Sequence, residues 1–352
     1  AFSVSDLVWK SSLKNPFFPP KKLRDWLRRA LNNNPLDAWI LRYAFKSVKQ
    51  VIKDCGISNQ EFLSFANEQL MITAQAKSDE TPFIFGAAGL TYTNYSNFSV
   101  PGGLIEMIRA VELYLNERGS EIKTRHFVKK IHKTGDGYQV ESSKGVYSAA
   151  LVVSNIPVWN MADLTEGKVR DYFRKESERY SRAWGAITSG IVVQDQFDED
   201  LSLHHQIHLG GAQVPYTDSE SIFISLSDRE DAERTKNGNR VLNISCHARP
   251  EYWFSLNGNY DEAKQQTEEF IIQSLSDKLP GFEREKIKLV HTATPVTWQN
   301  WVYRKKGRVG GIPQSMARSL LDWTPNATPF DGLYLCGDTV YPGQGIAGVT
   351  LS

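Results

Sequence analysis

The sequence predicts an α/β fold in which a nucleotide-binding type of domain is interrupted by an antiparallel-sheet domain. Three stretches predict it. Residues 101–157 have the pattern of a helix, a strand, a hairpin and a buried strand. Residues 332–349 have the pattern of a strand, an acidic turn, a glycine-rich loop and the start of a helix. Between them, strands joined by long connections with one late helix indicate an inserted α+β domain.

These patterns divide the chain into four segments. We expect a helical segment at 1–100, the central part of the nucleotide-binding domain at 101–160, the inserted domain at 161–325, and the C-terminal part of the first domain at 326–352. A chain of 352 residues is long enough for two domains.

Composition is that of an ordinary globular protein. Hydrophobic residues make up 41% and charged residues 23%, and the net charge of +1 gives no reason to expect a nucleic-acid partner. The cysteines, Cys55, Cys246 and Cys336, form no CxxC pair, so a reducing compartment fits better than a disulfide framework. No run approaches the ~18 apolar residues that a membrane-spanning helix needs.

The first 53 residues differ from the rest. They carry eleven basic and three acidic residues, a net charge of +8, against 30 basic and 37 acidic residues, a net charge of −7, in the remainder. Within them, a helix predicted over 21–31 carries Leu23, Trp26, Leu27 and Ala30 on one face. Apolar and aromatic residues on one face with Lys and Arg opposite suit an interfacial helix, and equally a surface helix with a solvated basic face.

Residues 37–54 and 59–73 are predicted helices, with Ser58 as a possible N-cap of the second. Residues 79–100 have a loop-like composition rich in Phe, Tyr, Gly and Thr. Their aromatic residues would either join the core or line an apolar ligand site, and composition favours the core: Phe83, Phe85, Tyr92, Tyr95 and Phe98.

The unit at 101–157 is well marked. Pro101-Gly102-Gly103 opens a helix with apolar residues at spacings of three, four and seven, and Gly119 closes it. Strands are predicted at 121–124, 127–133, 138–142 and 146–153, with a hairpin turn at 135–137. The apolar run 149–153 is typical of a buried strand in a parallel sheet.

The inserted domain begins with a charged helix over 168–182. Strands follow at 186–193, 221–227, 240–247 and 287–293, with a long amphipathic helix at 260–279. A histidine cluster, His204, His205 and His208, invites a metal interpretation, but no Asp, Glu or Cys stands beside it at metal-site spacing. The basic run 304–308 is either a solvated loop or lies beside an anionic cofactor.

Residues 343–348 match GxGxxG literally. We reject the Rossmann pyrophosphate interpretation, because five residues separate the strand-ending Gly337 from Gly343. Neither GxSxG nor GxxxxGK[ST] occurs, which excludes the nucleophile elbow and the P-loop.

The segment 337–345, GDTVYPGQG, resembles the C-terminal flavin motif of the carotenoid desaturase and carotenoid isomerase family, FAD-dependent oxidoreductases related to amine oxidases. Three further segments match in order: 101–103 with its helix, Gly119 and the Val128 strand; 150–157; and 294–297 with Arg304, Gly307 and Gly310-Gly311. The matches span most of residues 101–352. The end motif is specific, and the middle ones are shared by many flavin oxidoreductases.

The resemblance implies FAD held across the α/β domain. Val128 would meet the adenine end through its backbone, and Asp338 would accept hydrogen bonds from the ribityl or pyrophosphate region beside Gly337. Gly345 and Ile346 would offer backbone N–H groups to the pyrimidine side of the flavin, within the loop that also contains Gly343 and Gln344. A helix N-terminus there stabilises the negative charge of reduced flavin. No catalytic side chain is implied, since the flavin carries the chemistry.

The family's N-terminal strand, with its GxGxxG and ribose-binding acid, has no counterpart here. We therefore expect a fragment of a longer protein that binds FAD poorly alone and is inactive by itself.

The expected function of the parent protein is desaturation of a long apolar polyene such as a carotenoid. The alternatives are carotenoid cis–trans isomerisation with reduced FAD, a non-catalytic membrane-associated remnant, and, less favoured, amine oxidation. For a substrate that resides in membranes, the basic aromatic segment becomes a peripheral membrane-docking element, with Lys21, Lys22, Arg28 and Arg29 as its contacts. The inserted domain and residues 83–98 would then wall an apolar tunnel.

Overall fold

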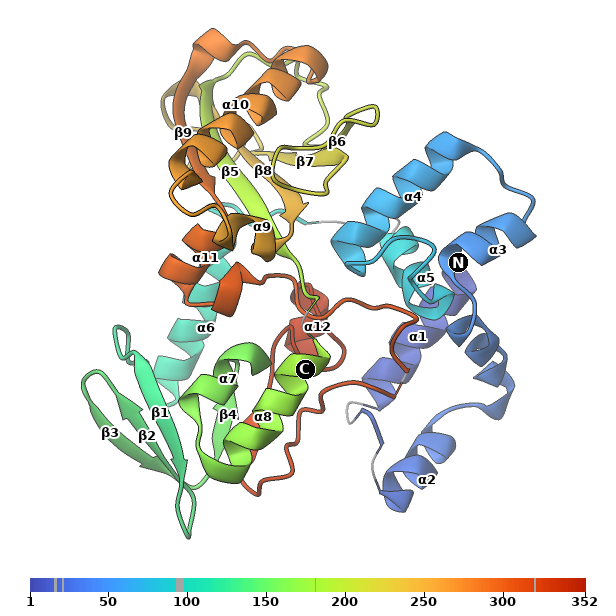
Figure 1. Ribbon diagram of the computed structural model, residues 1–352, viewed down its shortest axis with the longest axis vertical. Helices are drawn as coiled ribbons and strands as arrows, with labels where there is room; N and C mark the ends of the chain where they lie inside the picture. Colours follow the sequence, from blue (N-terminus) through green and yellow to red (C-terminus); the bar gives the residue numbers. More distant parts are fainter. Residues whose placement is uncertain (16–17, 21, 93–97, 181, 320) are drawn as a thin grey trace. The chain divides into compact units, whose positions relative to one another are not determined.

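The computed structural model describes residues 1–352 apart from residues 16–17, 21, 93–97, 181 and 320. It forms two compact units, shown in Figure 1. Unit 1 comprises residues 1–96, 126–183 and 310–352, and unit 2 comprises residues 97–125 and 184–309.

Unit 1 contains most of the helices. Its helical elements are α1 (Phe2–Lys14), α2 (Leu23–Asn32), η1 (Pro35–Ala44), α3 (Val48–Asp54), α4 (Gln60–Thr73), α5 (Phe83–Thr91), α7 (Val158–Leu164), α8 (Gly167–Arg179) and α12 (Ile346–Leu351). Its strands are β1 (Val128–Lys133), β2 (Tyr138–Ser142), β3 (Gly145–Ala149), β4 (Val152–Ser154) and β10 (Leu333–Leu335).

The strands of unit 1 form two sheets. Strands β1, β2 and β3 form an antiparallel meander. Strand β10 pairs with β4 in parallel, Leu333 opposite Val152, which confirms the parallel pairing expected for the run 149–153. The expected burial of that run was wrong, because Leu151 and Val153 are exposed. Val158, Phe173, Leu335 and Val340 belong to one buried cluster, which joins α7 and α8 to β10 and to the residues that follow it.

Unit 2 is built on a five-stranded antiparallel sheet in the order β6-β7-β8-β5-β9, as the sequence predicted for the inserted domain. Its strands are β5 (Gly185–Gln194), β6 (His204–His208), β7 (Ser221–Leu226), β8 (Asn239–Ala248) and β9 (Ile287–Ala293). Its helical elements are α6 (Ile105–Glu117), η3 (Lys236–Gly238), α9 (Pro250–Phe254), α10 (Tyr260–Lys278), η4 (Arg284–Lys286), α11 (Pro295–Val302) and η5 (Lys305–Gly307).

One face of this sheet packs against α10. Every second side chain of its strands points toward the helix. Among these side chains, Ile191, Ile224 and Leu242 belong to one buried cluster with Ile271 and Leu275 of the helix. This strict alternation is the period of two that an antiparallel sheet with one covered face requires.

The main segment of unit 2, residues 184–309, begins and ends at neighbouring backbone positions. The Val309 N–H donates to the Trp184 carbonyl at 2.9 Å, and Gly185 forms a β-bridge with Arg308. The other segment of unit 2, residues 97–125, is held by a separate contact. The Gly102 N–H donates to both carboxylate oxygens of Asp231, at 3.0 and 3.2 Å.

The compact units divide the chain differently from the expected boundaries. Residues 161–183 and 310–325 lie in unit 1, and the helix after Pro101 lies in unit 2. The reasons are local: α7 and α8 pack with β1 and β10 in one core, and Gly102 is bonded to Asp231.

Several expected elements differ in detail. The stretch 79–100 was expected as a loop but contains α5, because Gly86 and Gly89 serve helix packing: a Cβ at Gly86 would lie 2.2 Å from Cγ2 of Val48. Residues 121–124 form no strand, and the strand expected over 146–153 is interrupted between β3 and β4. The N-cap of α4 is Asn59 rather than Ser58, since its side chain accepts the Phe62 N–H.

Candidate functional site

The C-terminal loop of unit 1 is a backbone-rich turn between β10 and α12. Gly337 follows β10 with φ of 101°, and Gly345 precedes α12 with φ of 84°, a region that L side chains rarely adopt. A Cβ placed on Gly345 would meet no atom within 4 Å. The loop therefore presents bare backbone beside open space, as expected of a surface that receives a ligand.

Asp338 is held in this turn by a close backbone approach. A Cβ on Gly311 would lie 2.3 Å from the Asp338 carbonyl oxygen, and Gly311 itself has φ of 80°. Of the Gly310-Gly311 pair, Gly311 thus packs against Asp338, while Gly310 lies against the side chains of Gln75 and Gln344. Asp338 is partly exposed.

Gln344 connects the loop to the helical part of unit 1. Its side-chain amide donates to the Ile72 carbonyl of α4 at 3.1 Å. Gly343 lies beside Trp323, since a Cβ there would be 3.5 Å from the indole. Both residues support the loop from the protein side.

The start of α12 carries the two remaining loop residues, Gly345 and Ile346. Val349 donates its N–H to the Gly345 carbonyl at 2.9 Å, which closes the first turn. Within the part of the chain that the structure describes, no hydrogen bond is found from the backbone N–H of either residue. Such N–H groups at a helix start are the ones that have no partner inside the helix.

Val128 lies in unit 1 at the start of β1. It is partly buried against the cluster that also contains Leu335 and Val340. The loop residues and Val128 therefore share one unit and one core.

The sequence did not indicate the ring cluster around Tyr341. The Tyr341 hydroxyl lies 2.6 Å from the Ser12 hydroxyl of α1, and its ring lies 4.5 Å from the Phe18 ring and 5.7 Å from the Trp323 ring, centroid to centroid. Tyr341 and Trp323 are both buried. Ser12 and Phe18 lie 329 and 323 positions before Tyr341 in the sequence, so no local sequence pattern indicates that these residues meet.

Two arginines border this cluster. The Arg29 guanidinium lies 4.7 Å from the Phe18 ring centroid, and Arg318 lies 5.0 Å from that of Trp323. Burial lowers the pKa of both guanidinium groups, while Tyr341 raises that of Arg29 in part. For Tyr341 itself, burial raises the pKa of the phenol, so it stays neutral at physiological pH.

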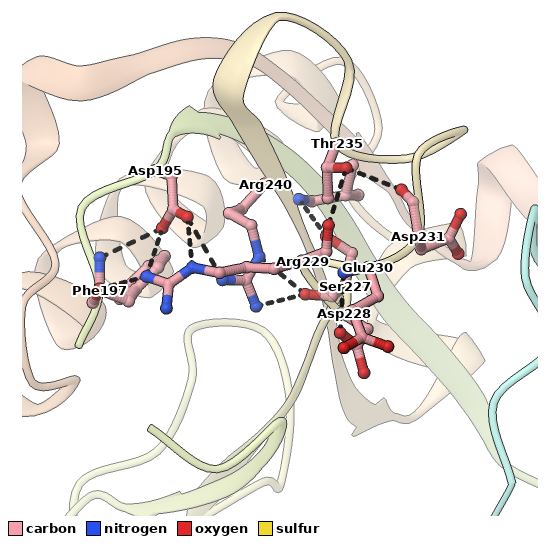
Figure 2. Close-up of polar contacts among 10 residues, drawn as sticks. Asp195, Phe197, Ser227, Asp228, Arg229, Glu230, Asp231, Thr235 and Arg240 are labelled. Carbon is pink, nitrogen blue, oxygen red and sulfur yellow. Dashed lines mark hydrogen bonds and ion pairs between the residues drawn. The ribbon is translucent and has the colours of Figure 1, made fainter. Parts of the chain in front are cut away.

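A second polar cluster lies in unit 2 and is structural. Figure 2 shows Arg229 donating to both carboxylate oxygens of Asp195, at 2.7 and 3.3 Å, and Arg240 donating to the Ser227 carbonyl. Burial alone would raise the pKa of Asp195, but the Arg229 hydrogen bond holds it below its usual range. These contacts fix the end of β5 to the connection between β7 and β8.

The other candidates from the sequence lie elsewhere. His204 stacks on Phe223, and among the described residues no cluster of three metal-ligating side chains is found. Phe83 joins the core beside Tyr43, Phe85 contacts Trp323, and Phe98 is 90% exposed. Tyr95 lies outside the described residues. The basic run 304–308 belongs to unit 2.

The described helices give one further limit. None of them is both long enough and apolar enough to cross a membrane.

Comparison with known proteins matches the family described as flavin containing amine oxidoreductase over residues 26–352. Among curated proteins, the chain is 28% identical to the chloroplastic prolycopene isomerase of Daucus carota and 27% identical to that of Arabidopsis thaliana, each over 90% of this chain. It is 29% identical to prolycopene isomerase 1 of an Oncidium hybrid cultivar, also over 90%. The chain spans about half the length of these relatives, 53% to 55%.

Solved structures show the same fold. An oxidoreductase from Methanosarcina mazei superposes with a TM-score of 0.60 at 19% identity, covering 94% of this chain and 72% of the other. A putrescine oxidase variant superposes with a TM-score of 0.59 at 14% identity, covering 96% and 68%. The match over residues 26–352 places the chain in the flavin containing amine oxidoreductase family, with FAD as its cofactor.

Proposed function

We propose that this protein serves the cis–trans isomerisation of a carotenoid or similar long polyene, with FAD as cofactor. The observation that carries the proposal is the similarity to three prolycopene isomerases across 90% of the chain. An isomerase leaves the number of double bonds unchanged, so its reaction needs no net electron acceptor.

Desaturation, which the sequence favoured, is the second candidate. It would remove two hydrogens from a C–C single bond and deliver a hydride equivalent to the cofactor and a proton to solvent. It is supported by the family resemblance of residues 337–345. The similarity to prolycopene isomerases favours isomerisation over desaturation.

We infer that the glycine loop holds the redox end of FAD, which supplies electron transfer to and from the polyene when bound. The N–H groups of Gly345 and Ile346 would donate to its electron-rich pyrimidine side. Asp338 would accept hydrogen bonds from the adjoining chain of hydroxyls, and Gly337 would leave room for that chain. Gly343 and Gln344 keep the loop in shape, and Val128 would contribute at the adenine end. The open space at Gly345 and the absence of a Cβ at Gly337 fit such a ligand.

Product analysis separates the two reactions. The full-length protein, reconstituted with FAD and a reductant, is given a poly-cis and an all-trans carotene, and the products are resolved by chromatography and absorbance. Isomerisation predicts altered geometry with an unchanged count of conjugated double bonds. An increased count would overturn it in favour of desaturation.

A non-catalytic remnant is the alternative from a different class. An absorbance spectrum of the full-length protein at saturating FAD tests it directly. A protein-bound flavin spectrum supports the enzyme, whereas its absence would support the remnant.

We further propose that the protein works at a membrane surface, because its substrate class partitions into lipid. The support is the exposed basic residues of the N-terminal segment, among them Lys22, Arg24 and Arg28. Lys21 lies outside the described residues. Flotation with anionic vesicles should weaken in the Lys22→Glu/Arg28→Glu variant, and flotation equal to the wild type would contradict the role of these charges.

A further inference from the structure

Helix α2 is amphipathic, with its apolar face turned outward. Leu23, Trp26, Leu27 and Leu31 are 76%, 46%, 56% and 85% exposed, and no residue of the helix is buried. At about 100° per residue, these side chains and Ala30 occupy one contiguous face. A surface helix of a globular protein normally buries that face against the core.

Helix α2 contacts the rest of unit 1 through one of its polar residues, Arg29. Arg29 packs over the Phe18 ring, with its guanidinium carbon 4.7 Å from the centroid, and is only partly exposed. The helix is therefore attached to unit 1 through an arginine, and its leucines and tryptophan contact solvent.

Helix α1 also exposes bulky apolar side chains, although Val4 is buried and Leu7 and Val8 pack against the core. Ser5 and Ser12 are buried, at 0% and 5% exposure, while Phe2, Trp9 and Leu13 on another side of the helix are exposed. The Ser12 hydroxyl faces Tyr341. Both helices thus expose bulky apolar side chains, while Ser5 and Ser12 of α1 are buried and Arg29 of α2 is partly buried.

The charged residues around the apolar face of α2 indicate what this face binds. Lys22, Arg24 and Arg28 border the apolar face of α2, with Arg24 81% exposed, and Asp25 is the one acid of that helix. Exposed leucines and a tryptophan bordered by basic residues complement the acyl boundary and the anionic headgroups of a lipid leaflet.

We propose that the apolar face of α2, with Leu23, Trp26, Leu27 and Leu31, inserts into an anionic membrane surface, and that Arg29 and Phe18 transmit this docking to Tyr341 in the glycine loop. The inference rests on the proposed membrane function, and it gives Arg29 the role of a link to the loop in place of the headgroup contact expected from the sequence. Because Phe18 and Ser12 both touch Tyr341, whatever stabilises the α1–α2 arrangement also stabilises the loop.

Vesicle flotation tests the insertion. With vesicles of phosphatidylcholine and phosphatidylglycerol, the partition coefficient of the Leu23→Ser/Leu27→Ser variant should fall by about tenfold or more. The reason is that these two leucines, once inserted into the membrane, contribute most of the apolar attraction. Arg29→Gln should retain partitioning near that of the wild type. Leu289→Ser, which alters a leucine of unit 2 that is 60% exposed, is the matched control and should leave it unchanged.

Hydrogen exchange tests the link. Vesicles should slow exchange in the segment 338–349 of the wild type by about threefold or more, and this protection should be lost in Arg29→Gln even though that variant still floats. Protection that persists in Arg29→Gln, or that never appears in the wild type, overturns the link.

Two results overturn the membrane assignment itself. One is unchanged flotation of the leucine variant. The other is a wild-type dimer that becomes monomeric on Leu23→Ser/Leu27→Ser with no effect of vesicles, which would make the surface an interface between copies. Isomerisation assayed in detergent micelles is independent of vesicle binding, so failure here is distinguishable from failure of the proposed reaction.

Discussion

At the scale of single residues, the loop depends on positions where no side chain fits. Gly311 has φ of 80° and lies directly against the Asp338 carbonyl. The sequence showed that 310–311 was a glycine pair, but which atom it approaches is set by a contact across 27 positions. The acid of the motif is thus placed by a residue outside the motif.

Gly311→Ala is expected to destabilise unit 1 by about 2 to 4 kcal/mol, the combined cost of a left-handed conformation and a backbone clash. It should also weaken FAD binding by the full-length protein. Urea unfolding and flavin titration measure the two effects. Gly135→Ala, at a glycine with ordinary φ and no atom within 4 Å of a Cβ, is the control and should change neither.

Tyr172 is a second informative residue. Its hydroxyl is buried, and no hydrogen-bond partner for it is found in the described part of the chain. Tyr172→Phe removes this unsatisfied group while keeping the ring contacts with Phe173 and Phe330, so we expect unfolding to become harder by about 1 kcal/mol. Chemical denaturation at pH 7 checks it, and a loss of stability would show that the hydroxyl has a partner.

The same residue predicts a pH dependence. Burial raises the pKa of Tyr172 well above 10, and burial raises that of Tyr341 as well. A raised folded-state pKa contributes stability that is complete below the unfolded value of about 10 and is lost as the pH rises through the folded value. Thermal unfolding between pH 8.5 and 11 should show this decline, and Tyr172→Phe should make it shallower.

At the scale of elements, periodicity predicted the long helices and the strands of unit 2, because one face of each is buried. Strand β9 matches its predicted bounds, and α10 differs by one residue. The sequence was less informative where glycine serves packing, as in α5, and where bulky apolar side chains stay exposed, as in α1 and α2. The glycine loop was predicted from its motif, whereas Ser12, Phe18 and Trp323 were not, because their proximity to Tyr341 is purely tertiary.

Helix α6 shows why periodicity alone does not establish burial. Its apolar face is exposed, including Ile105, Ile108 and Val111, and no residue of the helix is buried. Ile108→Ala is expected to change stability by less than about 0.5 kcal/mol, while Leu275→Ala in α10, a fully buried position, should cost about 2 to 5 kcal/mol. Equal effects in denaturation would mean that α6 is covered in solution.

At the scale of the whole molecule, each unit has a core of its own. Ile187, Ile224 and Leu275 belong to unit 2, and Phe173 and Leu335 belong to unit 1. Separate cores predict separable stabilities. Leu275→Ala should accelerate amide exchange in β5 and β8 far more than in β10, and Phe173→Ala should do the reverse. Uniform acceleration throughout the chain by either variant would indicate a single cooperative unit.

The hydrogen bond from the Val309 N–H to the Trp184 carbonyl has a consequence for how such proteins diversify. Because the main segment of unit 2 begins and ends at adjacent backbone positions, a different sheet can be grafted between residues 184 and 309 without altering the path of the chain through unit 1. Such a graft needs an acceptor for the Gly102 N–H in the place of Asp231. The sheet of unit 2 can therefore be exchanged as one piece while the glycine loop stays in place.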